Sequence, residues 1–311
     1  MKAQVITRFG EPEVFEAREV DSPSAGPGQV LVRVAVAAVN PLDAKIRGGA
    51  LSSMFPTTFP AVLGNEIAGV VEAVGEGVTE PSVGDRVAGF VPSGGYAELV
   101  VTTPDRVVRV PDALPLTKAA TIPTAAETAQ RALALLDAQP GETVVVNAAA
   151  GSVGSAAVQL LNAARVRVIG TASEVNHDYV RALGATPVRY GDHLIADLAL
   201  AAPDGVDAAF DAGGRGFADR MLTLVEPSRI VTIVDFAAAR HGVQIAAGDP
   251  FAVDARSLAP VLDLAAHGRF ATEVAGVVAF DGVAEAHRRS EDGHLRGKLL
   301  VHVADIAGAN A

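Results

Sequence analysis

A short glycine-containing segment in the middle of the chain has the residue types of a phosphate-binding loop. It runs Ala148-Ala149-Ala150-Gly151-Ser152-Val153-Gly154, directly after the β-branched run at 144–147. Compared with the dinucleotide fingerprint G-x-G-x-x-G it reads A-x-G-x-x-G, with Ala149 in the first position. A pyrophosphate must approach backbone N–H groups where a helix begins, and a side chain at Gly151 would block that approach. A strand before the loop and a second strand after it favour a dinucleotide site over a plain structural turn. The residues expected to contact the pyrophosphate are Ala150, Gly151, Ser152, Val153 and Gly154.

The end of the next predicted strand distinguishes NAD from NADP. An acidic residue there binds the ribose 2′-hydroxyl of NAD and would repel a 2′-phosphate. Ala172 stands at that place, and Glu174 follows two positions later. NADP(H) is therefore the expected cofactor, with hydroxyl, guanidinium and phenol groups nearby as phosphate partners. These groups belong to Ser173, Arg189 and Tyr190, although Arg189 fits a solvated surface charge equally well. Thr171, at the end of the same strand, is a further expected cofactor contact.

Residue counts argue against several other kinds of chemistry. The 311 residues include no cysteine, so disulfides, cysteine zinc ligands and thiol nucleophiles are excluded. The seven histidines form no i,i+4 pair and no His-Glu-x-x-His motif, and no Gly-x-Ser-x-Gly hydrolase elbow occurs. We therefore expect no metal site and no serine or cysteine hydrolase.

Charge and hydropathy indicate the expected partners and cellular location of the protein. Lys and Arg number 25 against 36 Asp and Glu, a net charge of −11, which disfavours nucleic acids and anionic membranes. No run of about 18 apolar residues is free of charges, amides or glycines, and the N-terminus lacks a secretory signal. The expected setting is the cytoplasm, with no nucleic-acid or membrane partner.

The chain has two regions with different sequence patterns. Up to residue 113, β-branched runs alternate with glycine and proline turns, which predicts a compact β domain with strands at 30–39, 67–74, 86–90 and 96–101. From 114 on, strands alternate with helices, which predicts parallel βαβ units and an α/β fold class. The predicted strands are 143–146, 166–170, 206–211, 229–234, 273–280 and 298–303. The predicted helices lie within 116–136 and at 155–164, 176–183, 257–267 and 282–288.

Several motifs occur in the order and spacing of one known family. They are Asn40-Pro41-Leu42-Asp43, Gly64-x-Glu66-x-x-Gly69, Gly84-Asp85-Arg86-Val87, Gly95-Tyr96-Ala97-Glu98, the glycine loop and Arg296-Gly297-Lys298. From about residue 1 to 303 the chain resembles the zinc-independent, quinone oxidoreductase-like branch of the medium-chain dehydrogenase/reductase superfamily. The resemblance implies a GroES-like, β-rich catalytic domain over 1–113, completed by 250–311, and a doubly wound Rossmann domain over 114–249. It also implies a homodimer with NADPH-dependent reductase activity.

The motifs depart from the zinc-dependent members of that superfamily. Where those members carry Cys, His and Cys at the catalytic metal, this chain has Asn40, Asn65 and Thr124. Zinc polarises an alcohol or ketone oxygen, whereas hydride addition to an enone or quinone delocalises the charge within the acceptor. We therefore expect NADPH to reduce a quinone or the conjugated C=C bond of an enone or enal, without metal, in the cleft between the two domains.

The resemblance also implies roles for individual residues. Asn40 and Asp43 are expected beside the nicotinamide and the substrate, where Asn40 orients the carboxamide or donates to the substrate oxygen and Asp43 acts as an orienting group. Thr128 is expected at the nicotinamide ribose or amide. From the residues alone, Asn40 also fits a turn, Asp43 a surface acid paired with Lys45, and Thr128 an ordinary hydroxyl at a helix start.

Other residues leave two interpretations open. Tyr96 is a candidate proton donor, although its Gly-Gly-Tyr-Ala-Glu setting favours packing. Arg296 and Lys298 fit either a cofactor phosphate or a basic turn, and the backbone of 211–214 fits either the cofactor cleft or a tight turn. The aromatic content is 5%, and the rings that could stack on a substrate or serve the core are Phe55, Phe59 and Phe251.

The roof of the expected pocket departs from related sequences. Glu127 and Gln130 stand where related sequences generally have an apolar and an aromatic residue, which leaves room for a specialised substrate. An enoyl-thioester (polyketide-type) reductase is the first alternative function, and its basic entrance would draw on Lys45 and Arg47. A non-catalytic NADPH-binding protein is the second.

Overall fold

The computed structural model describes residues 1–248 and 254–306, and the chain divides into two compact units. The first unit is built from residues 1–124 and 254–306, and the second from residues 125–248. Residues 114–124 thus belong to the first unit rather than to the Rossmann part, because α2 (Leu116–Ala119) packs against strands of the first unit. Within the described residues, no helix is both long and apolar enough to cross a membrane.

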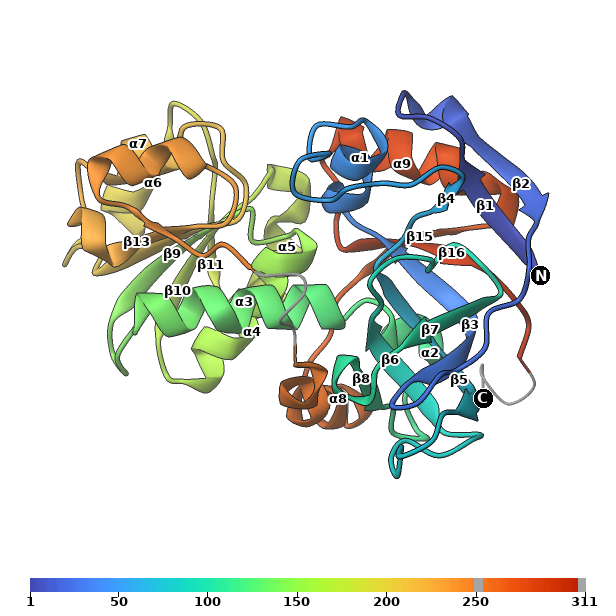
Figure 1. Ribbon diagram of the computed structural model, residues 1–311. Coiled ribbons are helices and arrows are strands. Elements are labelled where there is room, and N and C mark those ends of the chain that lie inside the picture. The colour runs from blue at the N-terminus through green and yellow to red at the C-terminus, as the bar shows by residue number, and fades with distance from the viewer. Residues whose placement is uncertain (249–253, 307–311) are drawn as a thin grey trace. The chain divides into compact units, whose positions relative to one another are not determined.

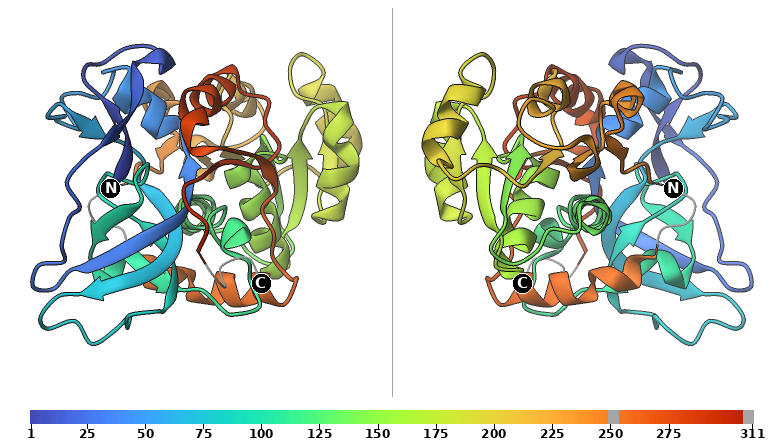
Figure 2. Two further views of the ribbon diagram at one scale, coloured as in Figure 1. Left: turned by 90° about the vertical axis from the view of Figure 1, so that its right-hand side faces the viewer. Right: turned by 90° about the vertical axis from the view of Figure 1, so that its left-hand side faces the viewer.

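Within the described residues, a seven-stranded sheet forms the framework of the first unit. Its order is β15-β16-β3-β5-β6-β8, with β7 paired to β3. The strands are β3 (Val30–Val39), β5 (Glu66–Val74), β6 (Arg86–Phe90), β7 (Leu99–Thr102), β8 (Val107–Arg109), β15 (Val274–Val278) and β16 (Lys298–His302). The β-branched residues at alternate positions of β3 favour an extended backbone. Figure 2 shows β3 and β5 running side by side, in agreement with their antiparallel register.

Smaller elements complete the first unit. A second sheet has the order β2-β1-β4, from β1 (Lys2–Ile6), β2 (Phe15–Glu19) and β4 (Ala61–Val62). The helices are α1 (Pro41–Arg47), α2, α8 (Ala259–Ala266) and α9 (Val283–Asp292). Helix α9 packs on α1 and β16, so it brings residues near the C-terminus next to the Asn40-Pro41 turn. Short 3-10 helices occur at Pro12–Val14, Pro104–Arg106, Ala255–Leu258 and Phe280–Gly282.

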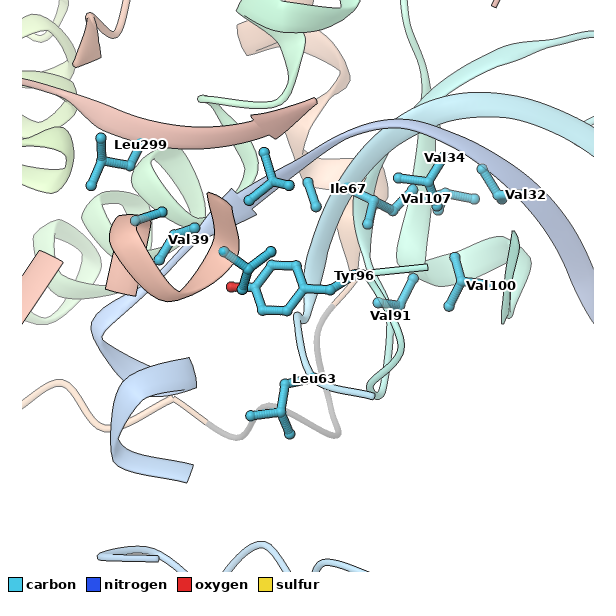
Figure 3. Packing of buried hydrophobic residues seen from close by; sticks show 14 of the residues in the cluster. Val32, Val34, Val39, Leu63, Ile67, Val91, Tyr96, Val100, Val107 and Leu299 are labelled. Atoms are coloured by element: carbon cyan, nitrogen blue, oxygen red, sulfur yellow. The ribbon is translucent and has the colours of Figure 1, made fainter. Parts of the chain in front are cut away.

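Tyr96 lies inside the hydrophobic core of the first unit. Its ring is fully buried and is surrounded by Leu63, Ile67, Val91 and other apolar side chains of the cluster (Figure 3). The packing that its sequence setting favoured is present. A buried phenol needs a hydrogen-bond partner for its hydroxyl, so the hydroxyl of Tyr96 requires a polar group next to it within the core.

Within the described residues, the second unit contains a six-stranded parallel sheet in the order β11-β10-β9-β12-β13-β14. The strands are β9 (Thr143–Asn147), β10 (Arg167–Thr171), β11 (Thr186–Val188), β12 (Ala208–Asp211), β13 (Ile230–Thr232) and β14 (Gln244–Ile245). Numbered along the chain this order is 3-2-1-4-5-6, the doubly wound order of dinucleotide-binding sheets. Ligands of such sheets bind beyond the carboxyl ends of the strands, where the order reverses between β9 and β12.

Helices cover both faces of this parallel sheet. They are α3 (Pro123–Leu136), α4 (Ser152–Ala163), α5 (His177–Ala182), α6 (Leu194–Ala201) and α7 (Phe217–Met221), with 3-10 helices at Glu174–Asn176, Pro227–Arg229 and Phe236–His241. In Figure 1, α4 lies below the strands of the sheet, and α6 and α7 lie above them. Helices on both faces leave the carboxyl ends of the strands as the open edge for a ligand.

The predicted α/β class is confirmed, and most of the predicted elements are present. The helix predicted at 155–164 begins three residues earlier, at Ser152, because Gly151 is its N-cap and the glycine loop itself forms the first turn. The strand predicted at 96–101 begins at Leu99. Helices α1, α6 and α7 and the short strands β11 and β14 were not predicted, because such short elements show too few turns or alternations for a periodicity to stand out.

Gly69 lies where the backbones of β5 and β3 approach each other closely, and this provides a test of the first unit. A Cβ atom at Gly69 would lie 2.1 Å from the carbonyl oxygen of Arg33, a backbone atom that cannot move aside without breaking the strand pairing. We expect Gly69→Ala to lower the free energy of unfolding by about 1–3 kcal/mol through overpacking. The matched control is Gly48→Ala, where φ is −73° and the nearest atom lies 3.4 Å from the added carbon. Equal melting temperatures for the two variants would contradict this account.

Candidate active site

The Asn40-Pro41 turn starts helix α1 and orders the polar groups of the first unit. Asn40 is the N-cap, in an extended conformation, and Pro41 occupies the first helical position, where its missing N–H is not needed. The backbone N–H of Asn40 donates to Oδ2 of Asp43 at 2.9 Å. This capping arrangement fixes the carboxyl group of Asp43 relative to the side chain of Asn40.

Two charged residues hold the side chain of Asn40. Its Nδ2 donates to Oε2 of Glu66 at 2.9 Å and to Oδ1 of Asn65 at 3.3 Å, while its Oδ1 accepts from Nζ of Lys298 at 2.5 Å. Lys298 and Glu66 form an ion pair at 3.0 Å, and their side chains are only 5% and 0% exposed. The other carboxylate oxygen of Glu66 accepts from the backbone N–H of Thr124 at 2.7 Å. Both hydrogens of the Asn40 amide therefore have protein acceptors in this structure.

Lys298 and Arg296, which the sequence left open between phosphate contacts and a basic turn, lie in different surroundings. Lys298 belongs to the buried cluster around Asn40 and Glu66, and these two residues are its partners in the structure. Arg296 forms an ion pair with Glu273 at 3.4 Å, and both side chains are 40% or more exposed. Arg296 precedes β16 and its side chain is exposed, whereas Lys298 is the first residue of β16 and its side chain is buried.

A second network runs from Asp43 into the core. The hydroxyl of Tyr96 donates to Oδ2 of Asp43 at 3.1 Å, and Nε2 of His287 lies 3.2 Å from that hydroxyl. Nη1 of Arg47 lies 3.3 Å from Nδ1 of His287. Arg47 also binds both carboxylate oxygens of Glu291, at 2.8 and 3.0 Å. Sequence reasoning named Asp43, Tyr96 and Arg47 separately but did not find this network, because its members are spread over 249 positions and His287 gave no sequence signal.

Burial shifts the titration of this second network. Desolvation raises the pKa of Asp43 to about 7, although the hydrogen bonds from Asn40 and Tyr96 oppose the shift. Burial also raises the pKa of Tyr96 well above its ordinary value. Burial, with a smaller contribution from the Arg47 charge, lowers the pKa of His287 to about 3, so this imidazole is neutral at physiological pH.

A cavity of about 520 Å³ opens beside Asp43 within the first unit. Asp43 and Asn65 supply polar groups to its wall, and Ile46, Phe55 and Leu63 are among the apolar lining residues. Of the three candidate rings, Phe55 lines this cavity and Phe59 packs edge-to-face on Phe9 with centroids 4.9 Å apart. The third, Phe251, lies outside the described residues. The lining suits a mainly apolar molecule that also carries a polar function.

In the second unit, the glycine loop is shaped by close approaches. A Cβ atom at Gly154 would lie 2.1 Å from the carbonyl oxygen of Ala148, so this position requires glycine. Ala149, in the first fingerprint position, has room for its methyl group because the residue opposite is Gly170. A Cβ atom at Gly170 would lie 2.6 Å from that methyl group. The glycine that the fingerprint expects in the loop is thus compensated by a glycine on the neighbouring strand β10.

The start of α4 fits the pyrophosphate of a nicotinamide cofactor. Gly151 is the N-cap of this twelve-residue helix and places no side chain over its first N–H groups. Oγ of Ser152 is buried and has no hydrogen-bond partner among the described residues. A phosphate oxygen at the helix start would satisfy that hydroxyl and the first helical N–H groups together. Ala150 and Val153 flank these two residues in the loop.

A buried polar belt holds the loops at the carboxyl ends of the strands. Nδ2 of Asn147 donates to Oδ1 of Asp211 at 2.8 Å, and the hydroxyl of Thr171 donates to Oδ1 of Asn147 at 2.6 Å. Oδ1 of Asp211 also accepts from the backbone N–H groups of Gly213 and Gly214, at 3.0 and 2.7 Å. Thr171 therefore serves this belt, and the belt fixes the loop at 211–214 that the sequence left open between a cofactor contact and a turn.

The residues predicted for the 2′-phosphate occupy the end of β10 and the loop after β11. The hydroxyl of Ser173 accepts from Asn176 at 3.1 Å, and Tyr190 is 45% exposed. Arg189 forms a two-pronged ion pair with Asp197, with both contacts at 2.9 Å. Its guanidinium already has a carboxylate partner, which agrees better with the alternative reading of Arg189 as a structural surface charge.

Helix α3 carries the residues expected near the nicotinamide. The hydroxyl of Thr128, which is 9% exposed, donates to Oε2 of Glu127 at 3.3 Å. Arg131 pairs with Glu127 at 2.8 Å and also donates to the backbone oxygen of Ala246, just after β14. Glu127, which departs from the related sequences, is therefore neutralised within its own helix. Gln130 is partly buried on the same helix.

Both units match known domain families. Residues 26–112 match the alcohol dehydrogenase GroES-like domain, and residues 183–301 match the zinc-binding dehydrogenase domain. In solved structures, the chain superposes on the quinone oxidoreductase of Coxiella burnetii with a TM-score of 0.87 and 28% identity, over 98% of this chain and 99% of that one. A mycobacterial protein complexed with NADPH superposes with a TM-score of 0.83 and 26% identity, over 97% and 99% of the two chains.

Relatives in sequence agree with the structural matches. The chain is 35% identical over 226 residues to a quinone oxidoreductase of Pseudomonas aeruginosa, which covers 70% of this chain and 68% of that protein. It is 29% identical over 324 residues to the chloroplastic NADPH-dependent alkenal/one oxidoreductase of Arabidopsis thaliana, over 97% and 79% of the two chains. It is also 37% identical over 231 residues to the pikromycin polyketide synthase component PikAII of Streptomyces venezuelae, but it spans only 6% of that protein.

A GroES-like unit joined to a doubly wound nucleotide-binding unit defines an oxidoreductase of the pyridine-nucleotide class. The chain belongs to the medium-chain dehydrogenase/reductase family, in its quinone oxidoreductase-like branch. At the positions of the zinc ligands of other members it has Asn40, Asn65 and Thr124, and the described residues contain no cluster of three or more His, Asp or Glu that could hold a metal ion.

The buried Lys298–Glu66 pair yields a stability prediction. Lys298→Met leaves the carboxylate of Glu66 buried without its counter-charge, and we expect a loss of about 3–5 kcal/mol in unfolding free energy. The double variant Lys298→Met/Glu66→Gln removes both charges and recovers most of that loss. The control is Arg18→Met, whose ion pair with Glu16 is 45% and 48% exposed and whose loss costs less than about 1 kcal/mol. If Lys298→Met unfolds like the wild type, the pair does not organise this site.

Proposed function

We propose that the protein is an NADPH-dependent reductase that transfers hydride to a quinone or to the conjugated C=C bond of an enone or enal, without a metal. The observation that carries this proposal is the apolar cavity beside Asp43, in a unit where Asn40 is held by Lys298 and Glu66. Where zinc-dependent relatives activate the substrate oxygen with a metal, this arrangement offers hydrogen-bonding groups only. An acceptor that delocalises its own incoming charge fits such a cavity.

In this proposal the second unit binds the cofactor and the first unit binds the acceptor. Gly151 and Ser152 bind the cofactor pyrophosphate at the start of α4, with Gly154 keeping the helix close to the strand. The bound reduced nicotinamide supplies the hydride. The apolar lining of the cavity, including Ile46 and Phe55, binds the acceptor and excludes water from the reacting carbon.

NADP is preferred over NAD because no carboxylate stands at the end of β10. Ala172 occupies that position, and Ser173 and Tyr190 offer hydroxyl groups to a 2′-phosphate. The mycobacterial protein with bound NADPH and the NADPH-dependent relative of Arabidopsis support the same choice. By family resemblance we also propose that two copies of the chain form a homodimer and that the enzyme works in the cytoplasm.

Free enones and quinones are favoured over thioesters. A thioester arm carries phosphate groups and requires a basic entrance, and Arg47, one of the two candidate cations, is buried against Glu291 with 2% of its side chain exposed. Lys45 remains as the exposed cation on α1. The match to a polyketide synthase keeps the enoyl-thioester reaction as the second candidate.

An acceptor panel tests the reaction class. We expect NADPH oxidation, followed by absorbance at roughly 340 nm, with quinones, enals and enones, and faster turnover of a free enone than of its thioester. Simple saturated ketones serve as the control and should give no turnover. Turnover of saturated ketones alone would refute the proposed chemistry, and cofactor binding without turnover of any acceptor would favour a non-catalytic NADPH-binding protein.

The cofactor choice has its own test. In Ala172→Asp, a carboxylate faces the place of the 2′-phosphate, and we expect the Kd for NADPH to rise about tenfold or more, since repulsion of about 1.4 kcal/mol suffices for that change. The Kd for NADH should stay the same or fall. Fluorescence titration of the bound nicotinamide measures both constants without any acceptor. An isosteric control, Ala172→Asn, introduces no charge, and an equal loss of NADPH affinity in it would contradict the electrostatic explanation.

A further inference from the structure

The hydrogen bonds that end at Asp43 have one possible direction, and Arg47 sets it. A guanidinium only donates hydrogen bonds and keeps its charge at all physiological pH values. Nδ1 of His287, 3.3 Å from Nη1 of Arg47, must therefore be an acceptor. Because His287 is neutral, its single proton is on Nε2, which donates to the hydroxyl of Tyr96. That hydroxyl in turn donates to Asp43.

Arg47 is itself firmly held, so this polarity is a fixed property of the fold. Its Nε donates to the backbone oxygen of Gly10 at 2.9 Å, and two of its other donors bind the carboxylate of Glu291. The side chain of Arg47 is 2% exposed, whereas that of Glu291 is 41% exposed at the outer end of the chain of contacts. The network thus extends from the cavity wall to the surface, and its hydrogen bonds from Arg47 through His287 and Tyr96 all run toward Asp43.

Both donors that reach Asp43 use the same oxygen. Oδ2 accepts from the backbone N–H of Asn40 and from the hydroxyl of Tyr96, and no described residue donates to Oδ1. This is the pattern of a carboxylic acid whose carbonyl oxygen accepts two hydrogen bonds and whose other oxygen carries the proton. Asp43 lines the cavity, so this second oxygen belongs to a residue at the binding surface for the acceptor.

The charges around Asp43 nearly cancel. Lys298 on β16 favours the ionised form, while Glu66 on β5 opposes it. Arg47 on α1 and the neutral His287 on α9 lie beyond Tyr96. Burial then has the largest effect, and it raises the pKa of Asp43 to about 7.

We propose that Asp43 is the general acid of the reaction: it holds a proton on Oδ1 and donates it to the α-carbon of an α,β-unsaturated carbonyl acceptor. This inference rests on the proposed function. The β-carbon accepts the hydride and its electron pair from the reduced nicotinamide, and the π electrons of the C=C bond move toward the carbonyl. The α-carbon then forms its C–H bond as the O–H bond of Asp43 breaks and leaves a carboxylate. The products are a saturated carbonyl compound and the oxidised cofactor.

Tyr96, His287 and Arg47 position Asp43 but do not resupply its proton. A relay through them would end with a proton taken from Arg47, which a guanidinium does not release. Asp43 therefore regains its proton from water that enters the cavity after product leaves. The three residues act as positioning residues, which keep Oδ2 occupied and Oδ1 available.

The direct test replaces the acid with its amide. Asp43→Asn keeps the size of the side chain and its acceptor oxygen but has no acidic proton to transfer, and we expect kcat to fall about 100-fold or more at pH 6 with little change in KM. In the wild type we expect kcat to fall as pH rises through about 7, and this dependence should vanish in the variant. With an α-methyl enone, the wild type should form one enantiomer at the α-carbon and Asp43→Asn a mixture. Asp21→Asn, an exposed control, should behave like the wild type.

A second variant tests the positioning residues. Tyr96→Phe removes one donor to Oδ2, and since that hydrogen bond lowers the pKa of Asp43, the fall in kcat should move to higher pH. A purely structural role of Tyr96 would lower stability but leave the midpoint of the pH profile unchanged, and that result would overturn the positioning role.

The protonation of Asp43 can be measured without cofactor. Below its ordinary pKa of 3.8 the acid is protonated in both folded and unfolded chains, and between 3.8 and about 7 the folded protein binds more protons. Stability from this group is therefore lost as pH rises toward 7 and is fully lost above it. We expect Tm of the wild type, relative to Asp43→Asn, to fall from pH 5 to pH 8.

The outcomes separate this inference from the proposed function. If the wild type reduces enones but Asp43→Asn keeps its rate, pH profile and product chirality, the reductase stands and the acid role of Asp43 is wrong. An unchanged Tm difference between pH 5 and pH 8 also refutes a protonated Asp43. If the wild type reduces no acceptor, the proposed function fails, and the donor role fails with it.

Discussion

A buried ammonium group must have partners, and the way Lys298 meets this requirement organises the whole polar site of the first unit. Its ion pair with Glu66 and its hydrogen bond to Asn40 join β16, β5 and the start of α1 across 258 positions of sequence. Removing one charge would leave the other stranded in a dry environment. The pair therefore fixes the N-cap of α1, and through the N-cap it fixes the position of Asp43.

The parts of the site that the sequence predicted are those encoded by neighbouring residues. A strand, a glycine loop and a helix follow one another within about twenty residues, and the loop at 148–154 does open α4. The Asn40-Pro41 turn is equally local, because a cap and a proline at the first helical position lie side by side in the sequence. The alanine in the fingerprint is different, because its explanation is Gly170, which lies opposite Ala149 on the neighbouring strand. That compensation involves a contact between strand and loop, which spacing along the chain does not reveal.

The parts that the sequence did not predict depend on tertiary contacts. Arg296 and Lys298 look alike as two basic residues around a glycine, yet one lies at the surface and the other is buried with Glu66. Tyr96 looked like a packing residue and is one, but its buried hydroxyl also reaches Asp43. His287 gave no sequence signal, because its partners come from α1 and from the segment before β7. Periodicity and motif spacing describe elements one at a time, whereas these contacts arise only when several elements pack together.

The two networks meet at the Asn40–Asp43 turn, and their meeting connects the lack of zinc ligands with the acidity of Asp43. A divalent cation near a carboxyl group favours its ionised form and lowers its pKa. Here the positions of the family's metal ligands carry Asn40, Asn65 and Thr124, and the nearby charges are those of Lys298 and Glu66, which sum to zero. With no net positive charge to hold the carboxylate ionised, burial decides, and the pKa of Asp43 rises to about 7. With uncharged residues at the positions of the metal ligands and an ion pair of no net charge beside them, the site offers no Lewis acid and favours a protonated carboxyl group beside the cavity.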